Sequence, residues 1–236
     1  MKIFGASSSS KQTGIYKMPE FKGHSNLSDT VKLLNRIGFN NNDAKIAAKD
    51  IFKTYNNPKR GYHGINHIKN MLASFDKFLF ESSQSYKIKN PDEFKFAILM
   101  HDYVNGEPYE VEKSVLKARE FLHKTSNRNS SYIEGLILAT DYSKKQNQNF
   151  EQQLMQDIDI EILGKSAEEY KDYSKAIRLQ YAEYPDKIYN PARIKILQTF
   201  INKDKIYNTK YYQDKYESQA RENIKSEIES LTNSVK

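Results

Sequence analysis

The chain has 236 residues, a length that fits one compact domain better than two and that allows a large hydrophobic core. It contains no cysteine, which excludes disulfide bonds and thiolate metal ligands and is typical of a reducing, cytoplasmic environment. An excess of 37 Lys and Arg over 30 Asp and Glu gives a net charge of +7 and favours anionic partners. Because the lysines are spread over most of the chain without a dense basic block, we favour a phosphorylated small molecule as partner over nucleic acid.

The first 26 residues lack any helical or strand pattern. The stretch "SSSSKQTG" has linker composition, and Pro19 and Gly23 follow it without periodicity. We therefore expect a flexible N-terminal arm over residues 1–26 and a folded domain over residues 27–236. No apolar run approaches the roughly 18 residues that span a bilayer, and the start is too polar for a secretory signal. A cytoplasmic protein that does not enter membranes is expected.

Helical patterns dominate the first half of the folded part. Residues 27–39 predict a helix with Ser28 as its N-terminal cap and Gly38 as its end. Residues 41–55 predict a second helix, which "NNPKRG" terminates. A third helix over residues 65–81 has apolar residues at helical spacing, namely Ile68, Met71, Leu72, Phe75 and Leu79.

The same pattern continues to the C-terminus, over residues 92–102, 110–125, 131–140, 150–164, 166–184, 190–204 and 216–231. Ser166 and Glu169 form an S-x-x-E capping box, and Pro191 is expected in the first turn of its helix. We find no strand alternation, no glycine-rich phosphate loop and no repeat of fixed period. The sequence predicts an all-α fold, a bundle of about nine helices joined by short connections.

Side chains that can bind a divalent cation occur in a definite order along these helices. His63 and His67 come first, His101 and Asp102 are adjacent, and Asp157 and Asp159 follow. Imidazole together with carboxylate suits Mn²⁺, Fe²⁺ or Zn²⁺ better than Ca²⁺. Each of these residues alone is more simply explained as a polar residue of a helical protein, so it is the ordered set that indicates a metal site.

His101 and Asp102 can face one ion only under a particular condition. Adjacent residues of a regular helix point roughly 100° apart, so the helix must end at this pair. Gly106 and Pro108 follow shortly afterwards and predict such an end.

The order H…HD…D on helices resembles the HD-domain phosphohydrolases. More closely, "RGYHGINHI", "FAILMHDYV", "DIDIEILG", "YKDYSKAIRLQY" and "ESQARENIKSEIESL" are similar to the predicted metal-dependent HD phosphohydrolases, over about residues 50–232. The resemblance implies a single helical HD-type domain that holds a divalent metal ion (Mn, Fe, Zn or Mg). By position, the implied ligands are His67, His101, Asp102 and Asp159, with Asp157 as the alternative for the last.

The resemblance also suggests catalytic roles. "YHGINH" is similar to a segment of cyclic-nucleotide phosphodiesterases, which implies that His63 is a general acid and not a ligand. Gly64 makes a regular helix between His63 and His67 doubtful. Asp102, besides ligating the ion, could accept a proton from water.

Two features depart from the family pattern. "LATDYSKK" has Asp141 where the family has a histidine nearby. Asp141 either substitutes for that histidine or caps a surface turn, so a second metal ion stays open. In the acidic run "NGEPYEVEKS", Glu112 is the carboxylate that best matches the family. It is expected either to hold water near the metal or to be the solvated start of the next helix.

Phosphate binding needs cationic groups, and Arg60, Arg178 and Arg193 lie in or beside the matching segments. The simpler role for such arginines is a helix-surface ion pair, which we favour for Arg221 with Glu217. The implied function is hydrolysis of a phosphomonoester or phosphodiester, with a nucleotide or related small phosphate as substrate. The alternatives are an alarmone or dinucleotide pyrophosphohydrolase, and a basic helical binding protein whose metal site is structural or vestigial.

Overall fold

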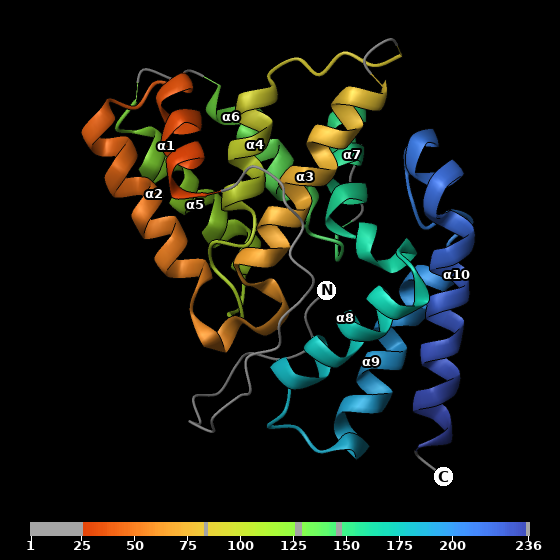
Figure 1. Cartoon of the computed structure of the whole chain (residues 1–236). Helices are drawn as coiled ribbons and strands as arrows, with labels where there is room; N and C mark the ends of the chain where they lie inside the picture. The colour runs from red at the N-terminus through yellow and green to blue at the C-terminus, as the bar shows by residue number, and fades with distance from the viewer. Residues whose placement is uncertain (1–25, 83–84, 126–128, 145–147, 235–236) are drawn as a thin grey trace.

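The computed structural model describes residues 26–82, 85–125, 129–144 and 148–234, and all regular structure in these ranges is helical (Figure 1). The all-α prediction is confirmed, with ten α-helices where about nine were expected. The predicted arm of residues 1–26 falls outside the described residues except for Asn26. The elements are α1 (Leu27–Arg36), α2 (Asn41–Tyr55), η1 (Pro58–His63), α3 (Ile65–Ser82), α4 (Pro91–Met100), α5 (Glu110–Leu122), α6 (Ser130–Ala139), α7 (Phe150–Asp159), η2 (Glu161–Gly164), α8 (Ala167–Gln180), α9 (Asp186–Ile201) and α10 (Lys210–Asn233), where η marks a 3₁₀ helix.

The helix ends agree with the sequence in part. The capping box of Ser166 and Glu169 is formed at the start of α8, as predicted. At α1, however, the side chain of Asn26 accepts from the backbone N–H of Asp29, so Asn26 is the cap and Ser28 is not. Pro191 does not lie in a first turn, because α9 begins at Asp186 and carries this proline inside it.

Two groups of helices face each other in Figure 1. α1, α2, α4, α5 and α6 form one group, α8, α9 and α10 form the other, and α3 and α7 lie between them. Within the groups α1 packs on α2, α4 packs on α5 and α6, and α10 packs on α9 and η2. None of the described helices combines the length and apolar character needed to cross a bilayer.

Helix α4 lies in the middle of the core. Phe94 and every residue from Phe96 to Met100 are buried, as expected of a helix that is apolar on all sides. The ring of Phe94 stacks on that of Phe75 in α3, with 4.2 Å between the ring centroids. The burial of α4 carries its C-terminal residues, His101 and Asp102, into the interior.

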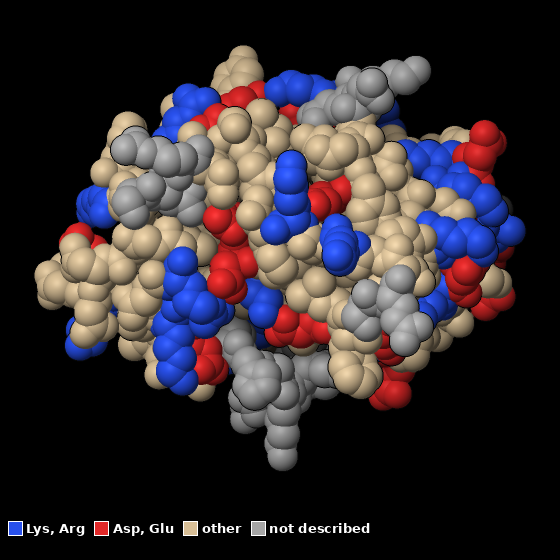
Figure 2. Space-filling model, turned by 90° about the horizontal axis from the view of Figure 1, so that it is seen from above, with Lys and Arg blue, Asp and Glu red and all other residues tan. Residues whose placement is uncertain are grey.

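The surface charge is mixed. On the face that Figure 2 shows, Lys and Arg atoms are interspersed with those of Asp and Glu and do not form one continuous basic field. Several lysines of the described residues make ion pairs within one helix, such as Lys117 with Glu120 and Lys210 with Asp214. Such pairs are typical of a solvated surface.

Candidate metal centre

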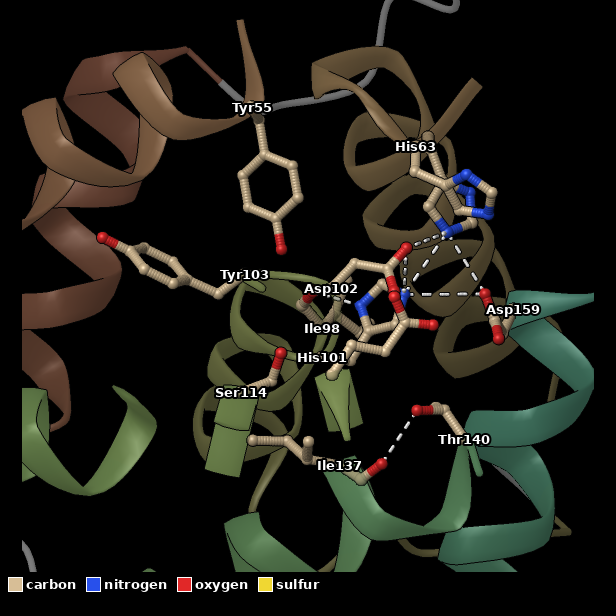
Figure 3. Close-up of polar contacts among 12 residues, drawn as sticks. Tyr55, His63, Ile98, His101, Asp102, Tyr103, Ser114, Ile137, Thr140 and Asp159 are labelled. Carbon is tan, nitrogen blue, oxygen red and sulfur yellow. Dashed lines mark hydrogen bonds and ion pairs between the residues drawn. The ribbon is translucent and has the colours of Figure 1, made fainter. Parts of the chain in front are cut away.

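Four side chains that are distant in sequence meet between α3, α4 and α7 (Figure 3). His67 lies in the first turn of α3, His101 and Asp102 directly follow α4, and Asp159 is the last residue of α7. His67 Nε2 lies 3.1 Å from Asp159 Oδ1 and 3.4 Å from His101 Nε2. His101 Nε2 lies 3.5 Å from Asp102 Oδ2 and 3.6 Å from Asp159 Oδ1. The structure therefore brings together all four residues that the resemblance implied as ligands.

The orientation of His101 fits a bound cation. Its Nδ1–H donates to the carbonyl oxygen of Ile98 at 2.9 Å, so Nε2 is the nitrogen that can bind an ion, by exchanging its proton for the metal. A hydrogen bond from the other ring nitrogen to a carbonyl oxygen is usual for histidines that bind metal ions. One ligand atom from each of His67, His101 and Asp102 can be chosen so that all lie within 4.8 Å of one another. Two imidazole nitrogens and one carboxylate at this spacing, with the carboxylate of Asp159 in contact with both rings, suit a divalent transition-metal ion.

The charges at this point also favour a cation. Burial lowers the pKa of His101, but the carboxylates of Asp102 and Asp159 outweigh it and raise that pKa to about 9. Burial alone would raise the pKa of Asp159. The hydrogen bonds and positive charge of His101 and His67 outweigh this effect and hold that pKa well below its ordinary value. The carboxylates thus stabilise positive charge between the two rings.

The turn at His101 and Asp102 is held by groups from α2 and η1. The hydroxyl of Tyr55 donates to the carbonyl oxygen of Leu99 at 2.9 Å. The guanidinium of Arg60 donates to the carbonyl oxygens of Asp102, at 2.6 Å, and Tyr103. The helix therefore ends where the sequence predicted. The phosphate-binding role predicted for Arg60 does not fit, because both terminal nitrogens of its guanidinium already hold the backbone of the turn.

Asp157 and Asp159 have separate surroundings. Both oxygens of Asp157 accept hydrogen bonds at the start of α10, from the backbone N–H groups of Asn208 at 2.8 Å and Thr209 at 2.7 Å and from the side chains of both residues. Burial raises the pKa of Asp157 to about 6, although these hydrogen bonds oppose the shift. Of the two carboxylates that the sequence left open, Asp159 is the one that contacts His67 and His101.

His63 lies beside the centre without joining the four. Its ring centroid is 5.8 Å from that of His67, and its Nδ1 lies 2.9 Å from the side-chain oxygen of Gln180 in α8. Gly61 makes this contact possible: its φ is 54°, and a Cβ there would come within 2.9 Å of the Cβ of Gln180. Tyr62 packs against both rings, with centroids 5.2 Å from His63 and 5.0 Å from His67. His63 is therefore oriented by protein contacts that do not require the metal.

A cavity of about 480 Å³ reaches this centre, a volume within the usual range for small-molecule sites. His63, Asp102 and Asp159 contribute to its lining, and so do residues of α5, α8 and α9. Arg193 lines the cavity too, but its guanidinium is paired with Glu227 at 2.8 and 3.1 Å. Two Arg193 nitrogens are thus committed to the fold, which limits its predicted role as a phosphate ligand.

Arg178 lies outside the cavity lining. Its guanidinium donates to Asp186 and to the carbonyl oxygens of Tyr181 and Tyr184, and so closes the connection between α8 and α9. This position does not fit the predicted phosphate contact. Arg221 forms the expected ion pair with Glu217, at 2.8 Å.

The acidic run predicted near the centre does line the cavity. Glu112 contributes to the lining and forms an ion pair with Lys144, which also lies 3.0 Å from Asp141. Asp141 accepts from the backbone N–H of Ser143 at 3.0 Å and so caps the turn, one of its two predicted roles. Lys144 is a cation in the cavity lining that the sequence did not single out.

Gln180 and Tyr62 were also missed from the sequence. Gln180 lies in the matching segment "YKDYSKAIRLQY", but it is 117 positions from His63, and nothing local indicates their contact. Tyr62 sits beside His63 in a predicted site segment, yet an aromatic residue there is equally typical of a core.

Comparisons of this chain with protein-family models, curated proteins and solved structures found no match. The resemblance to HD-domain phosphohydrolases therefore stays a prediction made from the motifs. The all-helical fold, the converging side chains and the adjoining cavity are properties of this structure.

Proposed function

We propose that this protein is a metal-dependent phosphohydrolase acting on a small phosphate ester. The single observation that supports this proposal most is the meeting of His67, His101, Asp102 and Asp159 at one end of a cavity large enough for a small molecule. A structural metal site normally has its coordination closed by protein ligands, whereas a catalytic site keeps positions open to solvent or substrate. The adjoining cavity favours the second kind of site.

When bound, a divalent ion supplies positive charge that polarises a phosphoryl group and makes water more acidic. Asp102 lines the cavity and is placed to accept the proton that the attacking water loses. His63 lines it as well, and its Nδ1–H is oriented by Gln180, so the proton given to the leaving oxygen would be the one on Nε2. The residues thus divide into a metal-holding set and one proton donor beside it.

Phosphate charge would be met by the metal ion and by Lys144. Lys144 lines the cavity and bridges Glu112 and Asp141, so it could turn toward a substrate phosphate from a position already near the site. Arg60 and Arg178 do not line the cavity, and their guanidinium groups hold backbone carbonyls instead.

The test combines metal analysis with a substrate screen. Protein purified without chelator is analysed for metal content and assayed with phosphomonoesters, phosphodiesters and nucleotides in the presence of Mn²⁺, Fe²⁺, Zn²⁺ or Mg²⁺. We expect about one ion per chain and hydrolysis that EDTA abolishes. Bound metal without hydrolysis of any ester would favour the structural-site alternative. Release of pyrophosphate from alarmones, or cleavage of dinucleotides at the phosphoanhydride bridge into two nucleotides, without hydrolysis of the other esters would favour the pyrophosphohydrolase.

A further inference from the structure

One part of the cavity lining is an apolar wall. We use this name for six lining residues of η2, α8 and α9 whose side chains carry no polar atom: Ile162, Leu163, Ile177, Ile196, Leu197 and Phe200. Ile196 and Phe200 are four positions apart in α9 and therefore lie on one face of that helix. Both are only half-buried, so part of their apolar surface is open to whatever fills the cavity. The wall cannot take part in the proposed proton transfers, because it has no titratable group.

Polar groups of the adjoining lining are engaged by the protein itself. Arg193 pairs with Glu227 through two nitrogens, and its third nitrogen, Nη1, lies 3.4 Å from the hydroxyl of Tyr173. The hydroxyl of Tyr189 is fully buried, so this residue presents its ring to the cavity. The hydroxyl of Thr140 donates to a backbone carbonyl of α6 at 2.8 Å (Figure 3). A ligand rich in polar groups would give up hydrogen bonds to water here and find few partners in return, which is costly.

The charges of the lining suit a ligand with a single anionic group. Three carboxylates that line the cavity, Glu107, Glu110 and Glu112, oppose additional negative charge. The cations Arg193 and Lys144 are each paired with a carboxylate. A phosphate at the candidate metal centre would have the metal ion and Lys144 to face, whereas a second anionic group elsewhere in the cavity would face carboxylates. The rest of the ligand should therefore be uncharged.

We propose that the apolar wall binds the organic part of the substrate and that this part is an uncharged aliphatic group. The substrate class that follows is an aliphatic phosphomonoester. This assignment rests on the proposed function, because the phosphate of the same molecule would have to reach the candidate metal centre. Burial of aliphatic surface on the wall supplies the binding energy that the engaged polar groups do not.

Primary alkyl phosphates of increasing length test the apolar wall through hydrolysis. Ethyl, butyl and hexyl phosphate release alcohols of nearly equal acidity, so a change in kcat/KM along the series reports contact with the chain and not the leaving group. We expect kcat/KM to rise roughly 2- to 4-fold for each added methylene, the effect of burying one such group. Hexyl phosphate should also be a better substrate than adenosine 5′-monophosphate or ribose 5-phosphate. A kcat/KM that does not change with chain length, or a preference for adenosine 5′-monophosphate, would overturn the proposal.

Binding of an uncharged alcohol tests the wall apart from catalysis. The probe is N-phenyl-1-naphthylamine, a neutral fluorophore whose emission rises in apolar surroundings. It is bound to the full chain and displaced by 1-hexanol, with adenosine as the polar comparison. We expect 1-hexanol to displace the probe at lower concentration than adenosine. No displacement by 1-hexanol, or displacement by adenosine at the lower concentration, would contradict the assignment.

Ile196→Ser locates this binding on the wall. The variant should weaken binding of 1-hexanol roughly 3- to 10-fold, because it removes apolar contact area and adds a hydroxyl. Ile194→Ser is the matched control and should bind 1-hexanol as wild type does. Ile194 is also half-buried in α9, but it lies two positions away, projects about 200° from Ile196 and does not line the cavity. Equal affinity in all three proteins, or an equal loss in the two variants, would overturn the proposal.

The apolar wall and the proposed function can fail separately. If 1-hexanol binds through Ile196 but no phosphate ester is hydrolysed, the wall stands and the phosphohydrolase proposal fails. If esters are hydrolysed at rates that do not depend on chain length, the phosphohydrolase proposal stands and the wall is not the site of the organic group. The chain-length series uses wild-type protein, so it decides the matter even if Ile196→Ser does not fold.

Discussion

Asp157 and Asp159 lie two positions apart on α7 and serve different parts of the molecule. Asp157 accepts hydrogen bonds from the backbone N–H groups that open α10, whereas Asp159 Oδ1 lies 3.1 Å from Nε2 of His67. Residues two apart on an α-helix project about 200° from each other, so the two carboxylates cannot share one role. One carboxylate fastens α10 to α7, and the other belongs to the candidate metal centre.

Substituting each carboxylate by its amide separates the two roles. Asp159→Asn should lose bound metal, because it removes an anionic ligand. Asp157→Asn should keep the metal but lose about 1–3 kcal/mol of the free energy of unfolding, since an amide nitrogen would face donors in a buried site. Metal analysis and urea unfolding of both variants provide the measurements. Loss of metal from Asp157→Asn alone would transfer the ligand role to Asp157.

Metal binding should be linked to thermal stability. An ion that binds only the folded chain raises stability by mass action, and this ion would join α3, α4 and α7. We expect EDTA to lower the melting temperature of wild type and to leave that of His101→Ala unchanged. His123→Ala, which changes an exposed histidine at the end of α5, should respond to EDTA like wild type. Equal responses of all three proteins would contradict the site.

The candidate centre could be predicted from the sequence because its residues lie in short motifs, each of which indicates its own local structure. The apolar run before His101 predicts a buried helix, and Gly106 and Pro108 predict its end, which the structure confirms at Met100. The resemblance to HD-domain phosphohydrolases then implied four ligands, with one choice left between Asp157 and Asp159. That choice depended on Asn208 and Thr209, which are about 50 positions away and reach Asp157 only in the folded chain.

The arginines show why the phosphate contacts could not be predicted in the same way. Arg60, Arg178 and Arg193 stand in suitable segments, but an arginine is equally able to bind phosphate, a carboxylate or backbone carbonyls. Its partner is decided by which acceptors the tertiary fold brings within reach. Here those acceptors are the carbonyl of Asp102 for Arg60 and the carboxylate of Glu227 for Arg193.

The buried pair of Arg193 and Glu227 should make stability depend on pH. Burial alone would raise the pKa of Glu227, but the charge and hydrogen bonds of Arg193 outweigh it and lower that pKa. The ionised carboxylate therefore stabilises the folded chain above its unfolded pKa of about 4.3, and this contribution is lost as the pH falls through the lower folded pKa.

Glu227→Gln tests this dependence. At pH 7 the variant should lose roughly 3–5 kcal/mol of unfolding free energy, because it leaves a buried guanidinium without its counter-charge. The difference from wild type should shrink as the pH falls below about 4.3. Glu229→Gln, an exposed position on the same helix, is the control and should unfold like wild type at each pH. A difference that stays constant from pH 7 to acid would show that charge on Glu227 is not the cause.

His63 should act on the substrate and not hold the metal. His67, His101, Asp102 and Asp159 already provide four ligand groups, and Nδ1 of His63 is directed to Gln180 and away from them. A histidine whose lone pair is committed to a metal ion cannot readily give a proton to a leaving oxygen, whereas one held by a side-chain amide can.

The variant His63→Ala should therefore bind metal as wild type does and lose roughly 10²–10⁴ in turnover, the usual scale for general acid catalysis. The loss should be smaller with a nitrophenyl ester, whose leaving group is acidic enough to depart without a proton. Gln180→Ala should show a smaller loss with the same dependence on the leaving group, because it only frees the ring that Gln180 orients. Metal content and turnover with alkyl and nitrophenyl esters, measured on the same preparations, decide the matter. If His63→Ala arrives without metal, His63 is a ligand; if it carries metal and turns over both esters normally, the acid is another group of the cavity.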